Sequence, residues 1–219
     1  MRSIYYYCIY NASKRGKTCI ACRAQWRLSM IYAEKEYPLK DNRICTLRSA
    51  AISDAAAMVE FLRISNEETY FMLRYPEEIT LTEDEETTIL KNWQEQPNKL
   101  LLLALINDEI AGSCGIAPIA AHLKTKHRGS FGISVKQKFW GLGVGSLLVR
   151  EILSFAKKSG IEQVELGVYS DNLRAQKLYE RFGFIEWGRL PDAYKLKDGS
   201  YRDEINMVLH LNNDSLIEP

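Results

Sequence analysis

The stretch Trp140-Gly141-Leu142-Gly143-Val144-Gly145-Ser146 lies between an expected strand at residues 128–135 and an expected helix at residues 143–159. Three glycines at alternate positions remove side chains from the loop, so a ligand can approach its backbone closely. The first turn of the following helix presents free N–H groups and the positive end of the helix dipole. This combination predicts a site for a phosphate-bearing ligand, with a glycine-rich turn that binds nothing as the alternative.

Two common nucleotide motifs do not fit this loop. A P-loop needs a lysine and a serine or threonine after its last glycine, and Ser146-Leu147-Leu148 has no lysine. A dinucleotide fingerprint needs a third glycine or alanine, and counting from Gly141 or from Gly143 reaches Ser146 or Leu148 instead. The loop also follows several expected strands, whereas the dinucleotide motif follows the first strand of its unit.

A second pattern follows, which consists of Val168, Asn172, Ala175, Leu178-Tyr179 and Gly183-Phe184. We expect a strand at 163–169 and an amphipathic helix at 172–182, closed by Gly183. Taken alone, Tyr179 would be interpreted as a core tyrosine on the buried face of that helix.

The two patterns together resemble the GNAT family of N-acetyltransferases. That family carries Arg/Gln-x-x-Gly-x-Gly/Ala, with a valine five residues earlier; here Val135 precedes Trp140-x-x-Gly143-x-Gly145. Trp140 stands where arginine or glutamine is usual. The second pattern matches the family's later motif, and residues 198–207 match its C-terminal segment more weakly. The resemblance covers about residues 45–211.

The resemblance implies that the loop holds the pyrophosphate of acetyl-coenzyme A and that the preceding strand pairs with its pantetheine arm. It implies a hydrogen bond from Asn172 to the coenzyme. It also implies that Tyr179 protonates the departing thiolate, a role that suits a phenol. The expected coenzyme-binding residues are Ile133, Ser134, Val135, Trp140, Gly141, Leu142, Gly143, Val144, Gly145, Ser146 and Asn172.

The sequence identifies the general base and the acceptor pocket less clearly than the coenzyme site. Some family members place a glutamate on the strand before the loop, and the same spacing leads here to His127, which could serve near neutral pH. A histidine at a strand edge without a catalytic role and proton loss through ordered water are the alternatives. The acceptor is expected between residues 66–74 and 191–201. The candidate acceptor-binding residues are Glu67, Glu68, Tyr70, Arg74, Asp192 and Tyr194. Their mixed charges do not choose between a polyamine, an aminoglycoside, an amino acid and a protein N-terminus.

The remaining elements predict a mixed α/β fold of the GNAT type, with a mostly antiparallel sheet flanked by helices. We expect a capping box at Thr82 and Glu85 and a hairpin turn at Asn107-Asp108. The expected strands are at 45–49, 99–106, 109–120, 184–190 and 201–211, and the expected helices begin near Ser53 and Thr82.

The chain of 219 residues suits a single catalytic domain, expected at 41–212, with a basic appendage at 1–40 and a tail at 213–219. Residues 1–29 hold six basic residues and no acidic one, while the whole chain is nearly neutral. The composition therefore does not favour a fold built to bind nucleic acid. No apolar run reaches the roughly 18–20 residues that a membrane-spanning helix needs.

Cysteine usage favours the cytoplasm as the compartment. The chain has five cysteines, and Cys19 and Cys22 form a lone C-x-x-C without the further ligands that a zinc site needs. The odd count and the lack of a convincing signal peptide indicate reduced thiols.

The expected function is transfer of an acetyl group from acetyl-coenzyme A directly to a primary amine of a small molecule or peptide, with no metal. The alternative is a regulatory module that binds acyl-coenzyme A without catalysis. The expected partners are the coenzyme and the amine, and a homodimer is left open.

Overall fold

The computed structural model describes residues 32–211. Within them, eight strands form one sheet in the order β1-β2-β3-β4-β5-β6-β8-β7. All neighbouring strands are antiparallel except β5 and β6, which are parallel. The strands are β1 (Lys35–Pro38), β2 (Ile44–Ser49), β3 (Leu100–Ile106), β4 (Glu109–Pro118), β5 (Arg128–Val135), β6 (Gln163–Tyr169), β7 (Ile185–Lys195) and β8 (Tyr201–His210).

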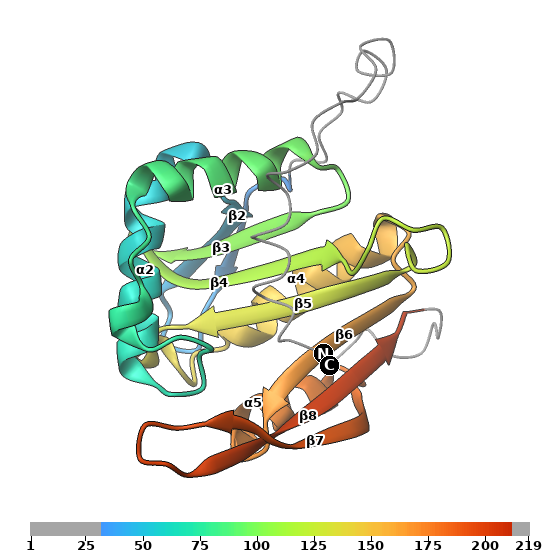
Figure 1. The fold of residues 1–219 in the computed structure, drawn as a ribbon. Coiled ribbons are helices and arrows are strands. Elements are labelled where there is room, and N and C mark those ends of the chain that lie inside the picture. The colour runs from blue at the N-terminus through green and yellow to red at the C-terminus, as the bar shows by residue number, and fades with distance from the viewer. Residues whose placement is uncertain (1–31, 212–219) are drawn as a thin grey trace.

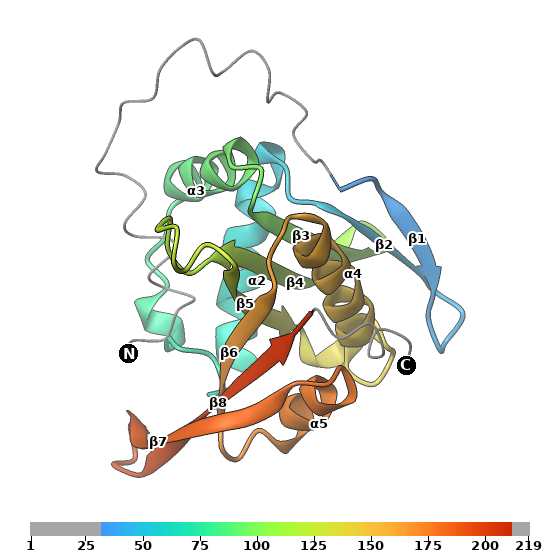
Figure 2. The ribbon, with the colours of Figure 1, turned by 90° about the vertical axis from the view of Figure 1, so that its right-hand side faces the viewer.

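Four α-helices cover the two faces of this sheet in the described residues. They are α2 (Ala55–Glu68), α3 (Glu83–Glu95), α4 (Val144–Lys158) and α5 (Leu173–Arg181). Helices α2 and α3 lie on one face, and α4 and α5 lie on the other (Figures 1 and 2). Short 3₁₀ helices at Ile52–Asp54, Pro76–Glu78 and Gln137–Phe139 complete the connections. The predicted mixed sheet flanked by helices is confirmed.

The two helical layers explain why β3 is apolar at every position. Leu100 and Leu102 face the core cluster that includes α4 and α5. Leu101 and Leu103 face the cluster under α2 and α3. Because successive strand residues point to opposite faces, a strand covered on both sides needs apolar residues throughout.

Two helix boundaries follow the local signals in the sequence. The Oγ1 of Thr82 accepts a hydrogen bond from the backbone N–H of Glu85 at 3.3 Å, and the Glu85 carboxylate accepts one from the N–H of Thr82 at 2.9 Å. This reciprocal cap starts α3, as predicted. Helix α4 ends before Gly160, whose φ of +76° is a conformation that glycine adopts easily.

The N-terminal boundary of the domain requires a correction. The expected appendage ran to residue 40, but Lys35–Pro38 forms strand β1 and pairs with β2. Four residues are too few to show a period of 2, and this strand is specified by its pairing with β2 instead of by its own pattern. Residues 1–31 and 212–219, which include Cys8, Cys19 and Cys22, lie outside the described residues.

The first helix also differs from its expected start near Ser53. A 3₁₀ turn over Ile52–Asp54 precedes α2, which begins at Ala55 and continues to Glu68.

The sheet opens between β5 and β6. These strands pair only where Arg128, Gly129 and Ser130 face residues 163–165. Beyond that point β5 stays with β4 up to Val135, while β6 stays with β8 up to Tyr169. The two strands therefore diverge toward their C-terminal ends, and a gap opens in the middle of the sheet (Figure 1).

Candidate active site

A pocket of about 730 Å³ fills the gap between β5 and β6 and reaches both faces of the sheet. On one face, here called the α4–α5 side, it is lined by the glycine loop and by residues of α5. On the other face, here called the α2 side, it is lined by Thr69, Phe71, Met72, Leu73, Tyr169, Tyr194 and Glu204. Two different ligands could therefore meet in the gap from opposite faces of the sheet.

The first two glycines of the loop have conformations that other residues rarely adopt. The φ angles are +82° at Gly141 and +102° at Gly143, and a Cβ built at either residue would meet nothing within 4 Å. Gly143 is the N-cap of α4, so the open space lies beside free N–H groups at the helix start. Gly145 differs, because a Cβ there would lie 3.3 Å from Leu178 of α5. The third glycine thus lets α4 and α5 pack closely.

Trp140 ties the loop to the end of β5. Its indole N–H donates a hydrogen bond to the carbonyl oxygen of Val135 at 2.6 Å. The guanidinium of Arg174 lies over the indole ring, 4.6 Å from its centroid. Trp140 therefore positions a cationic side chain at the pocket wall, which a cation–π contact favours.

Positive charge gathers on the α4–α5 side. Arg181 reaches the loop, with its Nη2 3.5 Å from the Oγ of Ser146. Several cations beside a helix N-terminus suit a ligand with several phosphate groups. The basic residues that line this part of the pocket are Lys40, Arg150, Arg174 and Arg181. The sequence patterns did not single them out. Lys40 and Arg150 come from segments far apart in the chain, and Arg174 and Arg181 lie within the second pattern but not at its motif positions.

The three strand residues expected to pair with the coenzyme, Ile133, Ser134 and Val135, line the pocket. One edge of β5 is bonded to β4 at these positions. The other edge faces the gap, since β6 has already diverged. An extended ligand could add to this free edge as another strand would.

Asn172 lines the pocket at the start of α5. Its side-chain oxygen accepts a hydrogen bond from the N–H of Ala175 at 3.2 Å and caps the helix. The cap fixes the orientation of the side chain and leaves its amide nitrogen as a donor.

Tyr179 lies on the buried face of α5 and lines the same pocket. Its ring packs edge-on against Phe131, with the centroids 5.8 Å apart. Burial, with a smaller contribution from Cys114, raises the pKa of the Tyr179 phenol above its ordinary value. The phenol is therefore protonated throughout the physiological range and can donate a proton or a hydrogen bond. Burial also raises the pKa of the Cys114 thiol, which keeps that residue from acting as a thiolate nucleophile.

His127, the candidate base, lies just before β5 and does not line this pocket. Its carbonyl oxygen accepts hydrogen bonds from the N–H groups of Glu162 at 2.8 Å and Gln163 at 3.1 Å. The backbone of His127 thus holds the start of β6 against β5.

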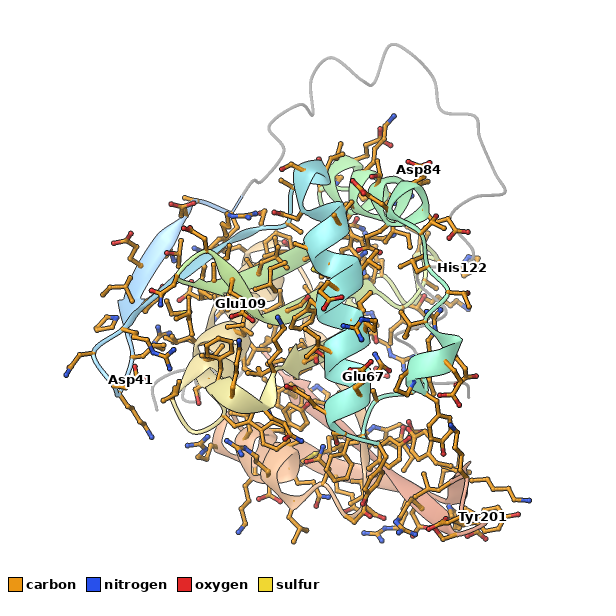
Figure 3. All side chains as sticks on the ribbon, turned by 90° about the vertical axis from the view of Figure 1, so that its left-hand side faces the viewer. Asp41, Glu67, Asp84, Glu109, His122 and Tyr201 are labelled. Carbon is orange, nitrogen blue, oxygen red and sulfur yellow. The ribbon has the colours of Figure 1, made fainter. Side chains whose placement is uncertain are left out.

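The four candidate acceptor residues from α2 and its following loop flank the pocket without lining it. Glu67 is exposed on α2 (Figure 3), where it forms an ion pair with Arg63. Glu68 accepts a hydrogen bond from the N–H of Gln137 at 2.7 Å. The Tyr70 hydroxyl donates to Asp171 at 2.7 Å, and Arg74 is half-buried in the loop. The residues between them, Thr69 and Phe71–Leu73, are the ones that reach the pocket.

Of the two candidate acceptor residues in the last hairpin, only Tyr194 lines the pocket. Asp192 is in a left-handed conformation, with φ of +52°, and its N–H donates to Asp203 at 3.1 Å. It belongs to the irregular part of β7 where the register with β8 shifts.

Residues 59–184 match the model of the Acetyltransferase (GNAT) family. The chain belongs to the GNAT acetyltransferase family. The predicted family and the predicted class of enzyme, an N-acetyltransferase, are thereby confirmed. Within this GNAT protein, the described residues contain no group of three or more His, Cys, Asp or Glu side chains that could hold a metal ion. Across residues 32–211, the helices are also too short or too polar to cross a membrane.

One curated relative and two solved structures are similar to this chain over more than half of its length. The L-amino acid N-acetyltransferase AaaT of Escherichia coli is 31% identical over 121 residues, which are 53% of this chain and 74% of that protein. A GNAT acetyltransferase structure from Streptococcus pneumoniae has a TM-score of 0.73 and 30% identity, covering 76% of this chain and 99% of its own. The structure of yncA from Salmonella typhimurium with its cofactor acetyl-CoA has a TM-score of 0.68 and 20% identity, covering 80% of this chain and 98% of its own.

Proposed function

We propose that this GNAT protein binds acetyl-coenzyme A on the α4–α5 side of the pocket and transfers the acetyl group to a primary amine that enters from the α2 side. The amine belongs to a small molecule or a peptide. The observation that carries the proposal is one pocket that crosses the sheet and contains both Tyr179 and the glycine loop.

The coenzyme phosphates would lie against the backbone of residues 141–146 and the N-terminus of α4. Four cationic side chains line that side and would complement the negative charge of the phosphates. The pantetheine arm would continue along the free edge of β5 at Ile133–Val135, with Asn172 donating a hydrogen bond from its amide nitrogen.

The reaction would be a direct transfer. The amine nitrogen attacks the thioester carbonyl carbon, a C–N bond forms, and the C–S bond breaks. The departing thiolate takes a proton from the Tyr179 phenol, which burial holds in its protonated form. No step needs an acetylated cysteine, since Cys114 is fully buried as a thiol.

The relative from Escherichia coli, named for acetylation of L-amino acids, makes these the first acceptors to test. Polyamines, aminoglycosides and peptides with a free N-terminus form the rest of the panel.

The test is release of free thiol from acetyl-coenzyme A with each amine, together with detection of the acetylated product. We expect at least one amine to give thiol and acetylated product in equal amounts. Coenzyme binding without product from any amine would instead favour a non-catalytic acyl-coenzyme A binding module.

A further inference from the structure

Glu204 of β8 is a buried carboxylate at the point where the gap opens. The residue is 7% exposed and faces Tyr169 in the register of β6 and β8. A Cβ built at Gly167 would lie 2.3 Å from the Oε1 of Glu204, so the carboxylate lies directly over the backbone of β6 at this glycine.

Gly167 follows by two residues the last paired residue of β6 opposite β5, which is Glu165. The carboxylate of Glu204 therefore extends from β8 across β6 to the border of the gap. It lines the pocket that also contains Tyr179, but from the opposite face of the sheet.

The charge of Glu204 is not neutralised by the basic side chains of the strands nearest to it. Arg128 of β5 pairs with Glu165 at 2.7 Å, and Arg202 of β8 pairs with Asp171 at 2.7 Å. The Oε1 of Glu204 instead accepts a hydrogen bond from the neutral Tyr194 hydroxyl at 2.6 Å. A buried carboxylate is costly unless a cation or several donors satisfy it, so this position favours a positively charged ligand.

The wall beside Glu204 is aromatic. The rings of Tyr169 and Tyr194 stack with centroids 3.9 Å apart and an interplanar angle of 10°. Tyr169 also meets Phe71 edge-on at 5.8 Å, and its hydroxyl donates to the carbonyl oxygen of Met72 at 3.4 Å. These side chains reduce the access of water to the carboxylate and thereby strengthen its attraction for a cation.

We propose that Glu204 binds the ammonium group of the acceptor and takes up the proton that the nitrogen must lose before it attacks. This inference rests on the acetyltransferase function proposed above. The acceptor would be a primary amine with one positive charge on an apolar body, because the other carboxylate at this face, Glu165, is neutralised by Arg128.

The proton balance closes with Glu204, Tyr179 and water. The ammonium gives one proton to Glu204, and the neutral nitrogen attacks the thioester. As the amide forms, the nitrogen loses its second proton to water. The thiolate takes a proton from Tyr179, and water then returns a proton to the phenolate. Glu204 releases its proton to water after the product leaves.

The other titratable groups that face Glu204 do not take this role. Burial, followed by the hydrogen bond to Glu204, raises the pKa of the Tyr194 phenol, so Tyr194 acts as a donor. Burial, with smaller contributions from nearby acidic and tyrosine side chains, raises the pKa of Tyr169 to about 12. Both phenols stay protonated at neutral pH and cannot accept the ammonium proton.

The test compares wild type with Glu204→Gln and Gly167→Ala by steady-state kinetics on the best amine of the panel. Glutamine keeps an oxygen for the Tyr194 hydrogen bond but has no charge. The alanine methyl group would displace the carboxylate, because a Cβ at Gly167 would lie 2.3 Å from the Oε1, 2.8 Å from the Cδ and 3.2 Å from the Cγ of Glu204. Gly188→Ala on β7 is the matched control, since a Cβ there meets nothing within 4 Å.

We expect kcat/KM for the amine to fall about 100-fold at pH 7 in both variants, the lower end of the effect of losing a general base. The loss should shrink as the pH rises through the pKa of the free amine, because neutral amine then needs no base. The dissociation constant of acetyl-coenzyme A should stay within about twofold of wild type, since Glu204 lies away from the phosphate site.

Wild-type kinetics in Glu204→Gln across this pH range would overturn the inference while leaving the proposed function intact. Weakened coenzyme binding in Glu204→Gln and Gly167→Ala would also overturn it, because the carboxylate would then serve the coenzyme site. Absence of acetyl-coenzyme A binding in wild type itself would refute the proposed function and this inference together.

Discussion

The hydroxyl of Tyr179 is the group whose removal should affect the reaction most specifically. Tyr179→Phe keeps the ring and its contacts with Phe131 and Phe184 and deletes only the oxygen. We expect kcat to fall by roughly 10²–10⁴-fold, as on losing a general acid, while coenzyme affinity changes little. The measurements are steady-state kinetics with the best amine and a binding titration with acetyl-coenzyme A. Wild-type turnover would leave Tyr179 as a core residue and water as the proton donor.

The glycine loop offers a test with an internal control on the same helix. Gly143 and Gly160 flank α4, and both have positive φ and open space at the Cβ position. Valine strains the backbone at either site, but only at Gly143 would it meet the coenzyme phosphates.

We therefore expect Gly143→Val to weaken acetyl-coenzyme A binding by at least about tenfold, or 1.4 kcal/mol, measured by calorimetry. Gly160→Val should lose a similar amount of stability but keep its affinity. Equal affinities in the two variants would remove the loop from the coenzyme site.

Local residue patterns predicted the α4–α5 side of the pocket better than the α2 side. The glycine loop lies within one continuous stretch, and Asn172 and Tyr179 lie within another. The order of residues in each stretch was therefore enough to predict their relative positions. Glu204 and Gly167 meet only through the pairing of β6 with β8, and no local pattern connects them. Lys40 and Arg150 were not anticipated either, because they come from segments far apart in the chain.

At the scale of elements, Glu151 attaches strand β1 to helix α4. Its carboxylate accepts hydrogen bonds from Lys35 at 2.7 Å and from the hydroxyls of Tyr32 and Tyr37 at 2.9 Å each. The same strand leads into Leu39 and Lys40, which line the pocket. A segment expected to lie outside the domain therefore supports the helix whose N-terminus forms the proposed phosphate site.

Replacing this carboxylate should destabilise the fold in a pH-dependent way. Glu151→Gln places amide hydrogens against donors, and we expect a loss of about 1–3 kcal/mol at pH 7. Burial opposes ionisation of Glu151, but the hydrogen bonds from Lys35, Tyr32 and Tyr37 outweigh it and lower its pKa. A lowered folded-state pKa contributes stability above the ordinary glutamate value of about 4.5, and this is lost as the pH falls through the folded value.

The difference in melting temperature between wild type and Glu151→Gln should therefore be largest near neutral pH and shrink below about pH 4.5. Thermal unfolding followed from pH 7 to pH 3 would measure it. Glu67→Gln is the control, because its ion pair with Arg63 is exposed and is expected to contribute little to stability. A pH-independent difference would mean that packing, and not charge, makes Glu151 important.

Element boundaries show the same division between local and long-range signals. The capping box at Thr82 and the glycine at the end of α4 were predictable, because both act within one helical turn. Strand β1 was not predictable. Its four residues show no clear period, and they are held as a strand by pairing with β2 and by hydrogen bonds to Glu151.

At the scale of the whole molecule, the gap between β5 and β6 connects the two faces of the sheet. The helices on one face position the glycine loop and Tyr179, and strands β6, β7 and β8 present Tyr169, Tyr194 and Glu204 on the other face. The coenzyme and the amine can thus approach from opposite faces and meet where the strands part. This arrangement supports the proposed direct transfer, since the reacting groups would need no intermediate carrier.

A crystal structure of the protein with coenzyme A tests this arrangement most directly. We expect the pyrophosphate against residues 141–146, the pantetheine arm along the free edge of β5, and the sulfur within about 3–4 Å of the Tyr179 hydroxyl. Coenzyme bound outside the gap, or a sulfur atom far from both Tyr179 and Glu204, would contradict the proposed site.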